Sequence, residues 1–268
     1  MTGTTGDPAP PHRASLTELI ATDVPCVAAP FDDRVTDEEL GAAVTAGLDV
    51  AELRIDLFAD ATPDRVVATA RRFAHVPTVA TIRSAAEGGN WSGDDAERLA
   101  LFRAVAPFVD ALDVEASSTA IADAVVAAAH AADALAIVSF HDFDALPPVA
   151  ELAERAGHAK QLGADLVKLA VRVTAPDELR ELAAFTLDHR DLGLIVIGMG
   201  PEGVATRLFF PFLGSRLTFA TAGRATAPGQ PDLAETVRTL VRCSPAYAAR
   251  LADRHADHHA DHHTEPAG

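Results

Sequence analysis

Short apolar runs of β type alternate with alanine-rich helical segments along almost the whole chain, and this alternation constrains the fold most. The β-type runs are expected at 25–30, 48–58, 78–83, 111–116, 135–143, 166–173, 192–200 and 217–223. Helical segments lie between them, for example at 37–47, 94–108 and 147–163. Strands that alternate with helices form parallel sheets, and eight such units in 268 residues match the size of an eight-stranded barrel. The sequence therefore predicts a single (β/α)8 TIM barrel.

Residues at the ends of the expected helices support these boundaries. Asp37, Asp94 and Pro176 fall near helix starts, where carboxylates and proline suit the exposed amides. Gly47 and Gly163 fall near helix ends, where glycine adopts the left-handed conformation at little cost.

The chain is expected to contain one folded unit. We place the catalytic barrel at 21–245, an N-terminal extension at 1–20 and a flexible tail rich in His and Asp at 246–268. No Gly/Ser-rich linker divides the barrel. An open doubly wound sheet is the alternative, but its only dinucleotide-type signal, GMGPEG at 198–203, comes too late in the chain.

Composition and charge limit the partners and the compartment. The net charge of −17 disfavours nucleic acid and anionic membranes as partners. The N-terminus lacks a secretory pattern and no apolar run is long enough for a membrane span, so a cytoplasmic protein is expected. Two cysteines, Cys26 and Cys243, do not make a disulfide framework, and Cys26 is expected to be a small buried apolar residue. Five histidines within 255–263 indicate a solvated tail with weak adventitious metal affinity.

Polar residues interrupt five adjacent β-type runs that should be apolar. They are Glu52, Arg54 and Asp56, then Thr81 and Arg83, Asp113 and Glu115, Ser139 and His141, and finally Lys168. A spacing of two places each set on one face of its strand. Burying so many charges is costly unless they line a polar pocket, which in barrels lies at the carboxyl ends of the strands. The pattern predicts a functional site there.

Lys168 is the most informative single residue. The chain has only two lysines against twenty arginines, yet Lys168 lies inside an apolar strand while Lys160 lies on the polar side of a helix. A lysine paired with a nearby carboxylate is the structural alternative, but arginine serves that purpose better. Only lysine offers an amine that attacks a carbonyl once it is deprotonated. We therefore expect Schiff-base chemistry at Lys168. His141, one strand away, could transfer protons near neutral pH.

These residues lie in motifs that resemble type I 3-dehydroquinate dehydratases, the Schiff-base enzymes of the shikimate pathway. The resemblance runs through ELRID (52–56), TIRSAAEGG (81–89), SFHDF (139–143), VKLAV (167–171), GMGPEGVATRLFFPFLGSRLTFA (198–220) and ATAPGQ (225–230). It implies a barrel that dehydrates 3-dehydroquinate to 3-dehydroshikimate by syn elimination, without metal or organic cofactor. Lys168 would form the imine, His141 would transfer the proton and Glu87 would position His141.

The resemblance also implies a substrate-binding set. Arg207 and Gln230 would hold the substrate carboxylate as the APGQ loop closes. The other implied contacts are Glu52 and Arg54 for the ring hydroxyls, Arg83 close to the same edge, Thr226 where a serine is frequent, and Met199 and Phe219 as apolar walls. Ile197 stands where another methionine is common, which leaves the details of the pocket open.

Two other functions compete with this one. A class I aldolase would need a phosphate site after the seventh and eighth strands, and a non-enzymatic barrel that binds small anions would not need Lys168. The sequence leaves the oligomeric state open between a monomer and a homodimer.

The scarcity of lysine beside 39 acidic residues suggests a source. An acidic, arginine-rich surface is what a high-salt cytoplasm favours, because salt screens its self-repulsion. We hypothesise a halophilic, archaeal source.

Overall fold

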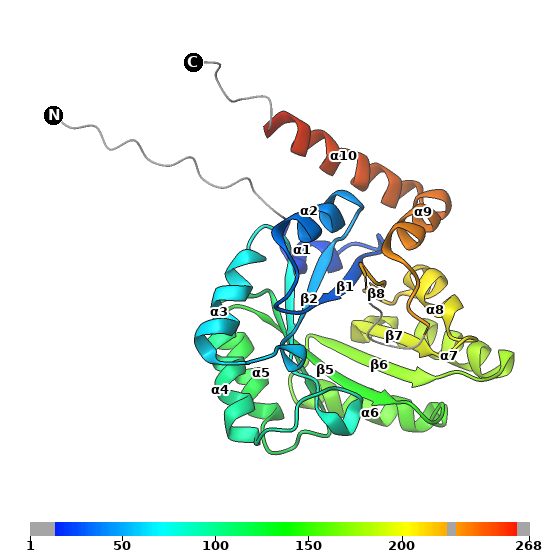
Figure 1. Cartoon of the computed structure of the whole chain (residues 1–268). Coiled ribbons are helices and arrows are strands. Elements are labelled where there is room, and N and C mark those ends of the chain that lie inside the picture. Colours follow the sequence, from blue (N-terminus) through cyan, green and yellow to red (C-terminus); the bar gives the residue numbers. More distant parts are fainter. Residues whose placement is uncertain (1–13, 224–228, 262–268) are drawn as a thin grey trace, which may run out of the picture.

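The computed structural model describes residues 14–223 and 229–261, in which eight strands form a nearly closed parallel barrel (Figure 1). The strands are β1 Val27–Phe31, β2 Val50–Arg54, β3 Thr78–Thr81, β4 Ala111–Glu115, β5 Leu135–Asp142, β6 Leu166–Arg172, β7 Leu194–Met199 and β8 Thr218–Phe219. They pair in the order β7-β6-β5-β4-β3-β2-β1-β8. Between β7 and β8, the backbone amide of Arg216 donates to the carbonyl of Leu194 at 2.7 Å. The predicted TIM barrel is confirmed, and β8 is shorter than expected.

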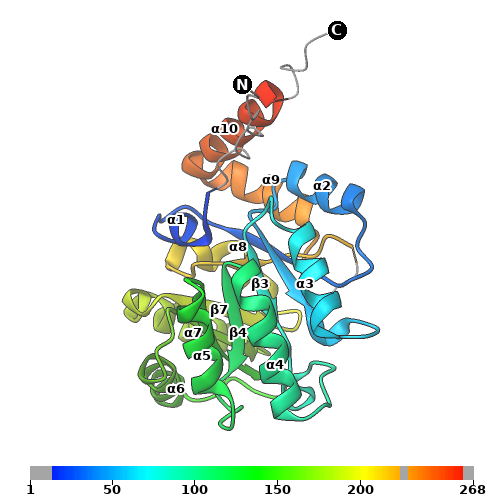
Figure 2. The same cartoon turned by 90° about the vertical axis from the view of Figure 1, so that its left-hand side faces the viewer.

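Helices surround the strands, and Figure 2 shows α3, α4 and α5 side by side on one flank. The helices are α1 Leu16–Ile20, α2 Asp37–Thr45, α3 Pro63–Arg72, α4 Asp95–Val105, α5 Ala122–Ala131, α6 Val149–Gln161, α7 Pro176–Asp188, α8 Val204–Phe209, α9 Leu233–Cys243 and α10 Pro245–Asp261. Asp94 caps α4 through the amide of Glu97, and Pro176 is the first residue of α7. Gly47, with φ of 107°, follows α2 as its sequence position indicates.

The end of the barrel where the strands begin is filled with apolar side chains. Leu16 and Leu19 of α1 pack against this layer together with Cys26, which is fully buried as expected. Leu16 and Leu19 therefore belong to the barrel core although they lie in the expected extension at 1–20, whereas Thr17 and Glu18 between them are exposed. The reason is that two leucines spaced by three residues share one face of a short helix and can bury together.

The segment expected to be a flexible tail also differs from its prediction. Helix α10 continues to Asp261, beside α9 in both views (Figures 1 and 2). Tyr247 is buried, and Arg250 and Arg254 both form ion pairs with the buried Asp49. Tyr247, Arg250 and Arg254 recur at helical spacing and connect the first turns of this helix to the barrel, a pattern that the His-rich composition obscures.

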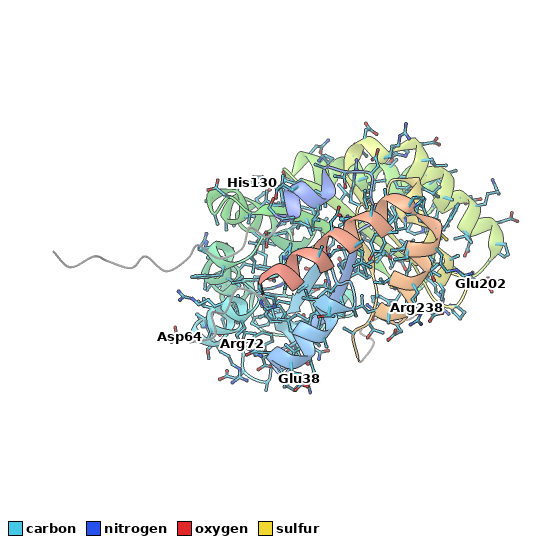
Figure 3. The ribbon with its side chains drawn as sticks, turned by 90° about the horizontal axis from the view of Figure 1, so that it is seen from above. Glu38, Asp64, Arg72, His130, Glu202 and Arg238 are labelled. Atoms are coloured by element: carbon cyan, nitrogen blue, oxygen red, sulfur yellow. The ribbon has the colours of Figure 1, made fainter. Side chains whose placement is uncertain are left out.

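Acidic side chains lie exposed on several surface elements. Figure 3 shows the exposed carboxylates Glu38, Asp64 and Glu202 on the periphery of the molecule. Within residues 14–223 and 229–261, no helix is long and apolar enough to cross a membrane.

Candidate active site

Polar and apolar side chains from six strands and the segments after them converge on one cavity. Its lining includes Glu52, Arg54, Arg83, Glu87, His141, Lys168, Met199, Arg207, Phe219 and Gln230. Ten of the eleven predicted site residues are therefore together. Thr226, the eleventh, lies outside the described residues.

Lys168 lies in β6 with its side chain only 6% exposed. Its Nζ is 2.9 Å from Oδ2 of Asp113 and 3.3 Å from Oε1 of Glu52. The same nitrogen lies 4.5 Å from the centre of the Phe219 ring, so the ring forms a wall beside it. The amine is thus paired with carboxylates, as expected for a lysine in a structural ion pair, and Lys168 also lines the cavity.

Asp113 connects the lysine to a larger buried charge cluster. Its Oδ1 accepts hydrogen bonds from Nη2 of Arg83 at 2.8 Å and from the hydroxyl of Ser139 at 2.7 Å. Arg83 also donates to Oε1 of Glu115 at 2.8 Å. Burial raises the pKa of Asp113, but Arg83, Lys168 and the Ser139 hydroxyl outweigh it and hold this pKa well below its ordinary value.

The sequence pattern included Asp113, Glu115 and Ser139 but gave them no role in the site. Arg83 was expected at the edge of the substrate, whereas three protein groups occupy its guanidinium. Strand alternation could have paired these residues, because Asp113 and Glu115 are inward-facing neighbours of Arg83. Arg98, which also joins the cluster through Glu115, comes from α4 and has no such signal.

His141 and Glu87 form the second functional pair. Nδ1 of His141 is 3.0 Å from Oε2 of Glu87, which also accepts the backbone amide of His141 at 2.9 Å. The Ser117 hydroxyl donates to the other oxygen of Glu87. With Glu87 ionised, Nδ1 carries the proton and Nε2 is left as the basic nitrogen. Burial and the positive charges of Arg83 and Lys168 lower the pKa of His141 well below its usual value, so the neutral imidazole prevails.

The local backbone conformation positions Glu87 against His141. Glu87 ends a 3-10 turn, Ala85–Glu87, and Gly88 follows with φ of 78°. This left-handed conformation favours glycine, and a Cβ at Gly88 would also displace the ring of the exposed Phe143. Burial raises the pKa of Glu87.

Arg54 and Asp56 depart from simple strand alternation. Strand β2 ends at Arg54, and Ile55–Leu57 form a 3-10 turn. The turn places the carboxylate of Asp56 beside Arg54, so Nε and Nη2 of Arg54 donate to its two oxygens at 2.9 and 2.7 Å. Arg54 therefore enters the cavity with a fixed orientation, while Asp56 supports it from behind.

Arg207 comes from α8 and is 1% exposed. Its Nη1 donates to the carbonyl of Phe219 at 3.2 Å, and burial lowers its pKa to about 10. A guanidinium stays charged at neutral pH even there, so it offers a desolvated positive charge to an anion. Gln230 lies on the same cavity just after residues 224–228, and Met199 lines it from the end of β7.

The chain is similar in sequence to several known proteins. The model of the type I 3-dehydroquinase family matches residues 26–244. The 3-dehydroquinate dehydratase of Methanococcoides burtonii is 33% identical over 203 residues, covering 73% of this chain and 86% of that protein. That of Klebsiella pneumoniae subsp. pneumoniae is 35% identical over 224 residues, covering 78% and 89%.

Two solved structures are similar as well. The 3-dehydroquinate dehydratase from Geobacillus kaustophilus superposes with a TM-score of 0.75 at 31% identity, covering 81% of this chain and 90% of that one. The type I enzyme from Clostridium difficile, solved with covalently modified comenic acid, has a TM-score of 0.71 at 27% identity, covering 81% and 91%.

Proposed function

The chain belongs to the type I 3-dehydroquinase family and is an enzyme of the hydro-lyase class, and from this premise we propose that it dehydrates 3-dehydroquinate to 3-dehydroshikimate in the shikimate pathway through an imine on Lys168. One observation carries the proposal. The amine of Lys168 and the His141–Glu87 pair line the same cavity, so a nucleophile and a proton-transfer group can reach one bound molecule.

The first step is attack of the neutral Lys168 amine on the substrate ketone. The carbinolamine that forms takes up a proton from water, loses its hydroxyl group as water and leaves a protonated imine, which is a better electron sink than the ketone. Asp113 and Glu52 lie 2.9 and 3.3 Å from Nζ and would stabilise this positive charge. The apolar face of Phe219 beside Nζ limits the access of water to it.

The second step belongs to His141. Its Nε2 takes the proton from the carbon next to the imine and gives a neutral enamine. The leaving hydroxyl lies on the following carbon, and the imidazolium returns the proton to it as the C–O bond breaks. Because one base serves both transfers, the elimination is syn. Hydrolysis of the product imine then frees Lys168.

Different residues of the cavity would bind the carboxylate and the hydroxyl groups of the substrate. Arg207, with Gln230 beside it, would hold the substrate carboxylate, since a buried guanidinium binds a planar anion through two donors. Glu52 and Arg54 would hold ring hydroxyls. The remaining proposed contacts are Met199 and Phe219 as apolar walls, Arg83 through the carboxylates that it fixes, and Thr226.

The decisive experiment uses the two lysines as target and control. Borohydride added with 3-dehydroquinate should reduce the imine and attach the substrate to the peptide that contains Lys168. Lys168→Ala should lose both the adduct and the enone absorbance of the product, whereas Lys160→Ala should keep both, because Lys160 lies exposed on α6. An active wild-type protein that forms no adduct on Lys168 would rule out the imine mechanism.

We also propose that this enzyme works in a salt-rich cytoplasm. The net charge of −17 and the exposed carboxylates of the surface support this proposal, because such a surface repels itself at low ionic strength.

A further inference from the structure

Arg98 is a buried cation that lies outside the cavity and that the proposed mechanism does not use. It belongs to α4, is 1% exposed and donates through Nε to the carbonyl of Ile82 at 2.9 Å. Its Nη1 donates to the Ser118 hydroxyl at 2.8 Å, and its Nη2 binds Oε2 of Glu115. Every arm of the guanidinium is therefore held.

A continuous series of ion pairs joins Arg98 to the amine of Lys168. Glu115 binds Arg98 through Oε2 and Arg83 through Oε1. Arg83 then binds Oδ1 of Asp113, and Oδ2 of Asp113 lies 2.9 Å from Nζ of Lys168. Each carboxylate uses one oxygen for each neighbour, so displacement of one member moves the next.

The charges in this series balance only when Arg98 is counted. The anions are Glu52, Asp113 and Glu115, and the cations are Arg83, Arg98 and protonated Lys168. Without Arg98, three carboxylates would face two cations, one of them the lysine. Such an excess of negative charge would favour the protonated amine, which cannot attack a ketone.

Other charged groups also face Lys168 and must be considered with this series. They are Glu52 and Arg54 from β2, Arg83 after β3, Glu87, Asp113 from β4, His141 from β5 and Arg207 from α8. Arg54 is matched by Asp56, and His141 by Glu87. Arg98 is the cation of the series that does not line the cavity, which lets its charge be tested apart from substrate contact.

We propose that Arg98 is a positioning residue for Lys168: it holds Glu115, Arg83 and Asp113 in place and supplies the positive charge that allows the lysine to lose its proton before imine formation. This inference rests on the imine mechanism proposed above.

The test measures the pH dependence of borohydride-trapped adduct formation and of kcat in Arg98→Gln and Glu115→Gln. Arg98→Gln removes a positive charge, so the midpoint of the trapping profile should move up by about one pH unit and kcat at pH 7 should fall about tenfold. Glu115→Gln removes a negative charge, so its midpoint should move down. KM should change less than kcat, because neither side chain lines the cavity.

Two matched variants distinguish this role from a merely structural one. Arg98→Lys keeps the charge and should restore a midpoint near that of the wild type. Ser118→Ala removes hydrogen bonds to both Arg98 and Glu115 without changing any charge, and its midpoint should not move even if the melting temperature falls. If Arg98→Gln fails to fold, the downward shift in Glu115→Gln still tests the proposal.

Two results would overturn the inference. One is a wild-type pH profile in folded Arg98→Gln or Glu115→Gln, and the other is an equal shift in Ser118→Ala. Failure of the imine mechanism itself looks different, because the wild-type protein would then trap no substrate at any pH.

Discussion

Two buried carboxylates, Asp113 and Asp49, lie at opposite ends of the barrel and behave differently. Both are about 1% exposed in their side chains and both bind arginine. Asp113 belongs to β4 near the cavity, whereas Asp49 precedes β2 and binds Arg250 and Arg254 of α10. Burial with a cation is common to both, so this feature alone does not identify a functional site.

The pKa values of the two carboxyls shift in opposite directions. Arg83, Lys168 and Ser139 outweigh burial at Asp113 and lower its pKa. At Asp49 burial outweighs its two arginines, which are partly exposed to water, and the pKa rises. The cavity end thus pairs its carboxylate with a lysine amine as well as an arginine, whereas the other end pairs its carboxylate with two arginines, which stay charged. The comparison predicts that perturbing the first end changes chemistry and that perturbing the second changes stability alone.

The largest expected effect tests the chemistry of the catalytic end. His141→Ala should lower kcat by about 10³-fold, because no other group would move the proton, while the substrate is still trapped on Lys168 by borohydride. Steady-state turnover and mass spectrometry of the adduct measure the two outcomes. Retention of full activity would mean that the base lies elsewhere.

The second prediction concerns the stability of the same end. Asp113→Asn should reduce the free energy of unfolding by about 3 kcal/mol at pH 7, because it removes one partner from a buried ion-pair cluster. The pKa of Asp113 is depressed in the folded state, so its contribution is present above the unfolded value of about 3.9 and is lost as the pH falls. Urea unfolding should therefore show a smaller difference between variant and wild type at pH 3 than at pH 7.

An equal difference at both pH values would remove the contrast between the two ends. Asp142→Asn is the control, because Asp142 accepts only local backbone amides after β5 and its change should have little effect at either pH.

The sequence predicted the barrel well because its signals are local. Strand runs and helix ends such as Asp94 and Gly163 depend on neighbouring residues, and the structure has its strands and helices close to those positions. The ends of the chain were predicted less well. Leu16 packs in a cluster that includes Ile195, and Tyr247 donates to the carbonyl of Gly47; no local pattern reveals these contacts between residues far apart in sequence.

The convergence of the candidate site residues could be predicted, but their internal pairing could not. Residues that alternate on inward faces had to converge, so the proximity of Lys168 and His141 could be foreseen. The pairing of Asp56 with Arg54 depends on a 3-10 turn that breaks the alternation. The pairing of Arg98 with Glu115 joins helix α4 to strand β4, so it can be recognised only in the tertiary structure.

The third prediction tests the opposite end. Arg250→Met should reduce the free energy of unfolding by about 2 kcal/mol at pH 7 and leave kcat unchanged, because it deprives buried Asp49 of one counter-charge far from the cavity. The folded-state pKa of Asp49 is raised, so its contribution is complete below the unfolded value and is lost as the pH rises. The deficit should therefore be smaller at pH 5 than at pH 7.

Arg238→Met removes the same charge from the exposed surface of α9 and serves as the control. If it destabilises the protein as much as Arg250→Met, net charge rather than the pairing with Asp49 explains the effect.

The smallest expected effect separates both buried clusters from the surface. At molar KCl the screening length falls to about 3 Å, so repulsion among the exposed carboxylates weakens while the buried pairs change little. A gain of about 1 kcal/mol should raise the melting temperature of the wild-type protein by about 3 °C relative to 0.1 M KCl. Asp113→Asn and Arg250→Met should show the same increment, since neither touches the surface charge that salt screens. A wild-type melting temperature that is the same in 0.1 M and in molar KCl would contradict adaptation to a saline cytoplasm. If the rise in melting temperature with salt were lost in only one of the two variants, the salt effect would originate at that end of the barrel. A surface origin requires the same rise in both variants.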